Sequence, residues 1–167
     1  MPSINTPETG HVVHRKFARY QFLPFTDARL LAVLREGIQI IDSRIRGQAS
    51  CNAAFRELPG RRSFADLWAD PTVWINFDPQ MTPGVYGAKI FGYPPEITIT
   101  ATTLAKGRWW TAATLVHELA HVNGAPGARG GDHARDAEEV LRRCLLKDLV
   151  DPTVIGAITT SGHASLV

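Results

Sequence analysis

The chain has 167 residues, 44% of them hydrophobic, and a formal net charge of +2. This composition supplies one hydrophobic core, which argues against global disorder and favours a single domain. The near-neutral charge gives no electrostatic case for binding nucleic acid or an anionic membrane, and no apolar stretch reaches the length of a transmembrane helix.

The N-terminal residues 1–20 are expected to form a flexible arm, and residues 21–167 a single domain. The polar start of the chain lacks the apolar run of a signal peptide, so export would need another route or a larger parent chain.

The next three predicted elements are helices. Thr26 is the expected N-cap of a long amphipathic helix, which extends to about Arg46 with apolar residues at helical spacing. A second helix is expected over residues 50–58, before a Pro-Gly pair. Ser63 is expected to cap a short third helix that runs through Asp70.

The middle of the chain is richer in β-branched and aromatic residues and predicts three strands, over residues 72–78, 85–93 and 96–104. In the last of these, isoleucine and threonine alternate as in a half-buried strand. The simplest arrangement is a small antiparallel meander.

Two more helices are expected after the strands. Residues 111–122 are apolar nearly all round, which predicts a buried helix that ends at Asn123-Gly124. Asp132 can cap a last helix over about 133–149. The predicted fold class is therefore α+β, with N-terminal helices, a small sheet, a buried central helix and a C-terminal helix.

The buried helix carries the zinc motif H-E-x-x-H as His117, Glu118 and His121. Residues four apart lie on one helix face, so both imidazoles can reach one Zn²⁺ ion. Glu118 lies beside the metal rather than on it, and from there it can act as the general base that takes a proton from zinc-bound water. A buried helix has little reason to carry three such polar side chains otherwise, because burying an unpaired carboxylate is costly.

A catalytic zinc needs a third protein ligand and an open position for water. The longer motif that ends in a third histidine is absent: Gly124 stands at its glycine position, but Gly127 stands where the histidine would be. The last helix offers the alternatives. We expect Glu138 to be the third ligand, followed by Asp136 and then His133, whereas Glu139 points outward.

The run TAATLVHELAHVNGAPG, followed by DAEEVLRRCLL, resembles zincin metallopeptidases, in particular the effector domains at the C-termini of bacterial type VI secretion spike proteins and related polymorphic toxins. CNAAFRELPGRRSFADLWAD and VWINFD fit the same pattern, so the resemblance covers about residues 50–150. It implies a zincin-like fold and a zinc site made by His117, His121 and an acidic residue of the last helix.

The same resemblance implies a toxin or effector that is secreted or delivered into a target-cell periplasm, with a protein or peptide substrate and a cognate immunity protein. Without such delivery the protein would be cytoplasmic. In zincins an edge strand beside the motif helix binds extended substrate, and the resemblance assigns this role to residues 96–104. An ordinary half-exposed strand is the alternative.

Other residues carry weaker predictions. Cys51 and Cys144 are either one disulfide bond or two buried thiols. The candidates for stabilising an oxyanion are Tyr86, Tyr93 and His133. Trp109 and Trp110 either wall a specificity pocket or pack in the core. No specific role is expected for three further histidines: His11, His14 and His163.

The sequence thus predicts a zinc metallopeptidase and leaves two alternatives. One is a non-catalytic module in which a fourth protein ligand, such as Asp136 or His133, closes the zinc site. The other is a zinc amidase that acts on cell wall or a small molecule, since the motif defines the chemistry at the metal and not the substrate. The oligomeric state is left open.

Overall fold

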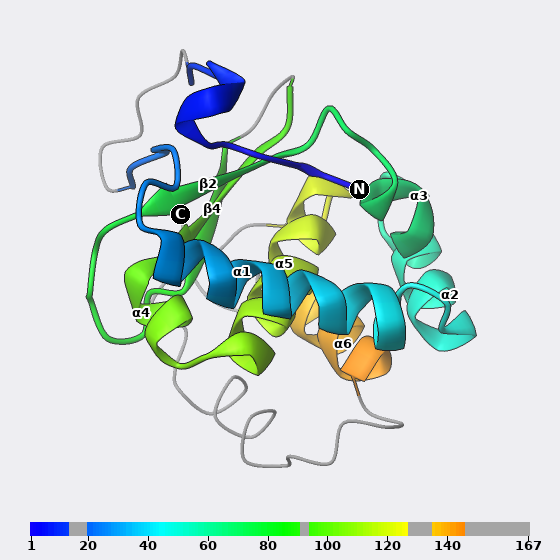
Figure 1. The fold of residues 1–167 in the computed structure, drawn as a ribbon. Helices are drawn as coiled ribbons and strands as arrows, with labels where there is room; N and C mark the ends of the chain where they lie inside the picture. Colours follow the sequence, from blue (N-terminus) through cyan, green and yellow to red (C-terminus); the bar gives the residue numbers. More distant parts are fainter. Residues whose placement is uncertain (14–19, 91–93, 127–134, 146–167) are drawn as a thin grey trace.

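The computed structural model of the chain describes residues 1–13, 20–90, 94–126 and 135–145. Within these ranges the fold is α+β, as predicted, with six α-helices and one four-stranded sheet (Figure 1). No helix in the described ranges is both long and apolar enough to cross a lipid bilayer.

The first long helix, α1 (Ala28–Ile40), continues into a π-helical turn, η2 (Ile41–Ile45), close to the predicted end of the element. Its N-cap is Asp27 and not Thr26. The Asp27 carboxylate accepts a hydrogen bond from the backbone N–H of Arg29 at 2.8 Å, and a carboxylate is also favoured by the helix dipole at this end.

The next two helices confirm the sequence prediction closely. Helix α2 spans Ala49–Glu57, and helix α3 spans Phe64–Trp68. Ser63 caps α3 as predicted: its hydroxyl accepts from the backbone N–H of Asp66 at 3.1 Å, and the Asp66 carboxylate accepts from the backbone N–H of Ser63.

The sheet is mixed rather than the predicted antiparallel meander. Its strands lie in the order β1-β2-β4-β3; β1 and β4 both run parallel to β2, and only β3 is antiparallel to its neighbour β4. The strands are β1 (Ser3–Ile4), β2 (Trp74–Asp78), β3 (Gly87–Ile90) and β4 (Glu96–Thr100).

The prediction that residues 96–104 form an edge strand is wrong. All five residues of β4 are buried, so this strand takes an interior position, and the edge beside it is β3. The strand is also shorter than predicted, because Thr100 caps a short helix, α4 (Ala101–Ala105), by accepting from the backbone N–H of Thr103.

Part of the segment 1–20, expected to be a flexible arm, belongs to the sheet. Beyond β1, the Asn5 amide donates to the Asn76 side-chain oxygen at 2.8 Å, and the Asn76 amide donates to buried Glu96 at 2.7 Å. His11, for which no role was expected, lies 2.8 Å from the other Glu96 oxygen and stacks on Trp74. A buried polar network therefore ties the N-terminus to the sheet.

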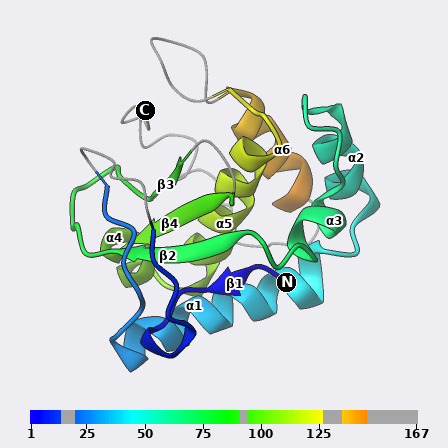
Figure 2. The same cartoon turned by 90° about the horizontal axis from the view of Figure 1, so that it is seen from above.

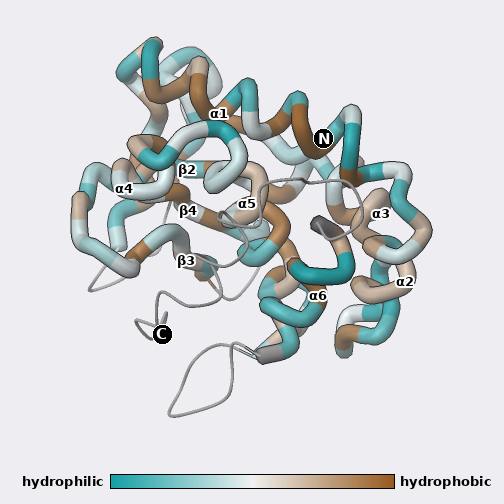
Figure 3. The backbone as a smooth tube through the Cα atoms, turned by 90° about the horizontal axis from the view of Figure 1, so that it is seen from below, coloured by the Kyte–Doolittle hydropathy of each residue, from teal (hydrophilic) through white to brown (hydrophobic). Residues whose placement is uncertain are grey.

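Helix α5 (Arg108–Val122) lies at the centre of the fold, in contact with β3, β4 and α1. Helix α6 (Arg135–Leu145) packs between α5 and α2, as the view from above shows (Figure 2). Along α1 hydrophobic and hydrophilic segments alternate, as expected for a helix with one face on the core (Figure 3). Cys51 and Cys144 form a disulfide bond, which settles the two alternatives for these residues.

Candidate metal centre

The motif helix α5 is buried on nearly every side, as the sequence predicts. It brings His117, Glu118 and His121 to the end of the helix that faces α6 and β3. Glu118 and His121 are buried, with 1% and 6% of their surfaces exposed, whereas His117 is half-buried. The site is therefore formed in the interior and opens toward solvent on the His117 side.

The two histidine rings converge on one point. Their Nε2 atoms are 3.1 Å apart, and the rings are steeply inclined to each other, at 77°. Two nitrogen ligands bound tetrahedrally to zinc, each about 2.05 Å from the ion, are separated by about 3.3 Å. The pair thus already has nearly the spacing that a single Zn²⁺ ion requires.

A backbone carbonyl fixes the orientation of His121. Its Nδ1 lies 3.0 Å from the carbonyl oxygen of Ala125, so Nδ1 carries the proton that it donates, and Nε2 has a lone pair, which accepts from His117 Nε2 in this structure. Burial lowers the pKa of His121, opposed by this hydrogen bond and assisted by the Lys89 charge. Burial and the Lys89 charge both favour the neutral form of the ring, which is the form that binds zinc.

The turn after α5 delivers that carbonyl. The N–H of Ala125 donates to the Ala120 carbonyl, and the N–H of Gly124 donates to the His121 carbonyl, which together make a Schellman C-cap. Gly124 has φ of +92°, a conformation that favours glycine. The predicted Asn-Gly stop is confirmed, and it also orients a proposed metal ligand.

Asn123 attaches this turn to the rest of the fold. Its buried side-chain amide donates to the backbone carbonyl oxygens of Phe55 at 2.7 Å and Arg62 at 2.9 Å. Its backbone carbonyl accepts from the N–H of Gly60 at 2.7 Å. The end of the motif helix is therefore held by the loop between α2 and α3.

Glu118 is a buried carboxylate with an unsatisfied oxygen. Among the described residues, Oε1 has no hydrogen-bond partner. Burial raises the pKa of Glu118 to about 8, and the positive charge of Lys89 opposes that rise. Burying such a group costs free energy, so Glu118, next to His117 in the chain, is a candidate for a chemical role.

Two residues of β3 shape the surroundings of Glu118. Lys89 donates to the carbonyl oxygen of His121, and burial lowers the pKa of its ammonium group while the Glu118 charge opposes that change. A Cβ at Gly87 would lie 2.9 Å from Glu118 Oε1, so the absence of a side chain there makes room for the carboxylate.

The burial of α6 separates the candidates for the third ligand. Glu138 is buried, with 9% of its surface exposed, whereas Asp136 and Glu139 are exposed. Within the described ranges, however, no three His, Cys, Asp or Glu side chains gather into a group that could hold a metal. Glu138 thus lies on the helix packed beside α5 but does not complete a ready three-ligand cluster. His133 lies outside the described residues.

The donors that converge nevertheless fit zinc by their chemistry. They are two imidazole nitrogens at the right separation, one of them oriented by a carbonyl. Imidazole nitrogen is a ligand that zinc prefers.

The aromatic candidates divide between core and surface. Trp110 is buried and packs in the protein interior. The centre of the Tyr86 ring lies 4.9 Å from the centre of the Trp110 ring, and the Lys106 ammonium lies 4.3 Å from the Trp110 ring centre. Trp109 is partly buried and lines a hollow of about 280 Å³ between α1 and α5, whose lining contains no residue of the histidine motif. Tyr93, His14 and His163 lie outside the described residues.

Sequence reasoning missed Lys89, Gly87 and the Ala125 carbonyl. A lone lysine in a predicted strand carries no signal, and glycine there indicated only a bend. The Ala125 carbonyl had an indirect signal, because Gly124 stands three residues after His121 and predicted a turn at that point.

Comparison with known proteins gives no match: no family model, no curated protein and no solved structure is detectably similar to the chain.

Proposed function

We propose that the protein is a zinc-dependent metallopeptidase that uses Glu118 as its general base. The observation that carries the proposal is the convergence of His117 Nε2 and His121 Nε2, 3.1 Å apart, next to an unsatisfied buried carboxylate. Zinc bound there would lower the pKa of a water ligand and polarise a peptide carbonyl.

Metal binding, ligand orientation and proton transfer would then fall to different residues. His117 and His121 hold the ion, and Ala125 keeps the His121 ring in the required tautomer. Glu118 accepts the proton of the attacking water and passes it to the leaving amine. Lys89 keeps a positive charge near Glu118, which favours the carboxylate form that can accept a proton.

Glu138 is the third ligand in this proposal, because it alone among the acids at 136–139 is buried. Its helix packs against α5, and in this proposal Glu138 reaches the ion through a change of side-chain rotamer or a shift of α6.

Glu118 also favours an enzyme over a module in which zinc only supports the fold. A structural zinc site gains nothing from a buried carboxylate that does not bind the metal, and it pays the cost of desolvating it. A general base, by contrast, needs that position and an elevated pKa.

The substrate side of the proposal rests on β3. This strand lies at the edge of the described sheet and packs against the motif helix. It is therefore suited to pair with an extended peptide beside the metal, the role that the resemblance assigned to residues 96–104. Delivery as a secreted effector remains the part of the proposal that comes from the resemblance alone.

The test combines metal content with hydrolysis. Zinc stoichiometry and affinity are measured by metal analysis and competition with a chelator, and cleavage by mass spectrometry of a mixed peptide library. We expect Glu118→Gln to keep zinc and to lose at least a hundredfold in activity, and His121→Ala to lose zinc. The matched control is Glu139→Gln, on an exposed residue of α6, which keeps both properties.

Three outcomes would contradict the proposal. Full activity in Glu118→Gln would remove the general base. Zinc held by four protein ligands without a water, seen by X-ray absorption spectroscopy, would point to a structural site. Cleavage of peptidoglycan fragments with no cleavage of any peptide would move the activity to a zinc amidase.

A further inference from the structure

Helix α6, which carries Glu138, depends on two neighbours for its position. Its buried face, which includes Ala137, Val140 and Leu141, packs against α5 and α2. The contact with α5 holds the helix that carries Glu138 against the motif helix, and the contact with α2 is the second constraint on its position.

Two specific links join α6 to α2. Cys144 forms the disulfide with Cys51, and both cysteines are fully buried. Next to it, the Arg143 guanidinium makes a two-pronged ion pair with Glu57, with one N–O distance of 2.9 Å. The ion pair is exposed to solvent and therefore weak. The disulfide is the link that matters, and it lies six residues, or about 9 Å of helix, from Glu138.

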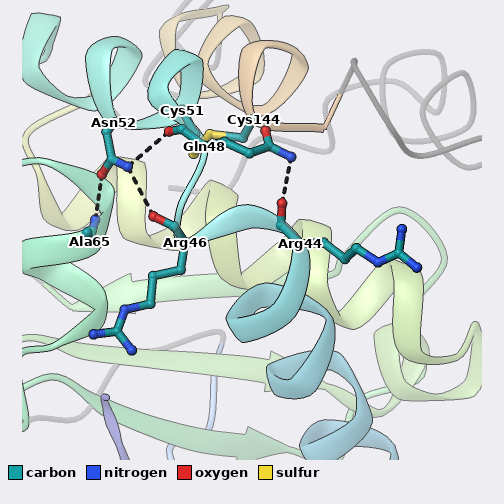
Figure 4. The surroundings of a disulfide bond; sticks show 7 residues. All are labelled: Arg44, Arg46, Gln48, Cys51, Asn52, Ala65 and Cys144. Atoms are coloured by element: carbon teal, nitrogen blue, oxygen red, sulfur yellow. Dashed lines mark hydrogen bonds between the residues drawn. A yellow bond between two sulfur atoms is a disulfide. The ribbon is translucent and has the colours of Figure 1, made fainter.

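Helix α2 is a firm point of attachment. The Asn52 amide donates to the backbone carbonyls of Arg46 and Gln48, while its oxygen accepts from the N–H of Ala65 at 2.9 Å (Figure 4). These bonds join α2 to the end of η2 and to the start of α3. At its other end, the Phe55 carbonyl accepts from Asn123, the residue that follows the motif helix.

The disulfide therefore completes a series of links between the two sides of the proposed metal centre. The series runs from His121 through Asn123 to α2, across the Cys51–Cys144 bond to α6, and along α6 to Glu138. Reduction of the disulfide removes the link to the helix that carries the proposed third ligand and leaves the histidine pair in place.

We propose that the Cys51–Cys144 disulfide is a redox control of the metal centre: oxidation fixes α6 so that Glu138 can complete the zinc site, and the dithiol form binds zinc weakly. This inference rests on the proposed zinc site. A chain made in a reducing compartment would stay inactive there and would become active after reaching an oxidising one.

The redox step is an ordinary thiol–disulfide exchange. The two thiols of Cys51 and Cys144 react with the disulfide of an oxidant, such as oxidised glutathione or an oxidised dithiol protein, through a mixed disulfide. One protein disulfide forms, the oxidant disulfide is reduced to two thiols, and the two thiol protons pass to the departing thiolates. Because both sulfurs are buried in the oxidised fold, the reaction belongs to a state in which α6 has opened from α2.

The first experiment measures the zinc affinity of the full chain and of Cys51→Ala/Cys144→Ala by chelator competition. We expect the double variant to bind zinc at least tenfold more weakly. The control is Leu67→Ala, a fully buried residue of α3, which should lose comparable stability while both cysteines keep their disulfide. It should keep wild-type affinity at a temperature where circular dichroism finds all three proteins folded.

A second measurement uses the wild-type chain and covers the case in which the double variant does not fold. The protein is equilibrated in glutathione buffers with and without zinc, and the disulfide fraction is read by alkylation and mass spectrometry. Because coupling is reciprocal, zinc should move the midpoint to more reducing buffers, by about 30 mV for a tenfold coupling.

The outcomes separate the two proposals. If the oxidised chain binds no zinc, the metallopeptidase itself fails. If zinc binds equally well with and without the disulfide, or leaves the glutathione midpoint unmoved, the zinc site stands and the redox control is wrong. An equal loss of affinity in Leu67→Ala would also overturn it, since the effect would then follow from general destabilisation.

Discussion

Gly87 on β3 lies directly against Glu118 on α5, and a Cβ at position 87 would come within 2.9 Å of Glu118 Oε1. The edge strand and the proposed base are thus in van der Waals contact, with no side chain between them. A substrate strand that pairs with β3 would lie about 4.8 Å from the backbone of Gly87.

Gly87→Ala should displace the Glu118 carboxylate while leaving both histidines in place. The added methyl group would also approach Thr114 and the Thr98 carbonyl, so we expect a loss of about 1 to 3 kcal/mol in stability. Activity should fall by about a hundredfold with zinc affinity nearly unchanged. Gly47→Ala is the control, since a Cβ there meets nothing within 4 Å. Unchanged hydrolysis in Gly87→Ala would mean that Glu118 is not the base.

The metal-free protein should lose stability as pH rises from about 4.5 to 8, because Glu118 holds one proton more tightly in the folded state than in the unfolded chain. Its pKa is raised from 4.5 to about 8 in the folded state, so the folded protein holds the proton more tightly than the unfolded chain does. The contribution is complete below pH 4.5 and is lost through pH 8, and its full size is about 4 to 5 kcal/mol.

The measurement for this prediction is urea unfolding in a chelating buffer between pH 5 and 9, for wild type and Glu118→Gln. The pKa of His121 is lowered, so its contribution has the opposite sign: it is present above pH 6.5 and fades as pH falls through the folded-state pKa. Both proteins share the His121 contribution, so the pH dependence of the difference between their unfolding free energies reports Glu118 together with its coupling to Lys89. A difference that does not vary with pH would contradict the raised pKa.

Gly124→Ala should weaken zinc binding through the Ala125 carbonyl. At φ of +92° an alanine is strained, and its Cβ would lie 3.1 Å from Pro59, so the turn must change and the bond to His121 Nδ1 with it. We expect a stability loss of about 1 to 3 kcal/mol and a tenfold or greater loss of zinc affinity. Gly10→Ala puts a similar strain on a remote turn at φ of +61°, and it should leave zinc affinity untouched.

Lys89→Met should shift the pH profile of hydrolysis. Without the ammonium charge the pKa of Glu118 rises further, so the acidic limb of activity moves to higher pH. Lys89→Arg keeps a charge at this position and should restore most of the wild-type profile. If Lys89→Met and Lys89→Arg lose activity equally and the pH profile of hydrolysis does not shift, Lys89 acts only by supporting the fold.

Local features were predictable because their causes are local. The Ser63 cap, the Asn123-Gly124 stop and the buried H-E-x-x-H helix each depend on residues within a few positions of one another. The helical spacing indicated that Glu139 points outward, and this residue is exposed, but spacing alone did not decide between Glu138, which is buried, and Asp136, which is exposed.

Pairings between distant segments were not predictable in the same way. Strand order depends on which strand is buried on both faces, and the alternation in residues 96–100 indicated a half-exposed strand although all five are buried. Lys89 reaches His121 only through the packing of β3 on α5, which leaves no trace in the spacing of either residue. The spacing of Cys51 and Cys144 likewise fitted a bond or two thiols.

The pairing of β1 with β2 has a consequence for folding during synthesis of the chain. Asn5 bonds to Asn76, 71 positions later, and Ser3–Ile4 pair with residues just before it. At ribosomal rates of 5 to 20 residues per second, the first strand waits roughly 4 to 14 seconds for its partner to be made. During that interval β1 is an unpaired strand, and its open edge can pair with any other extended chain.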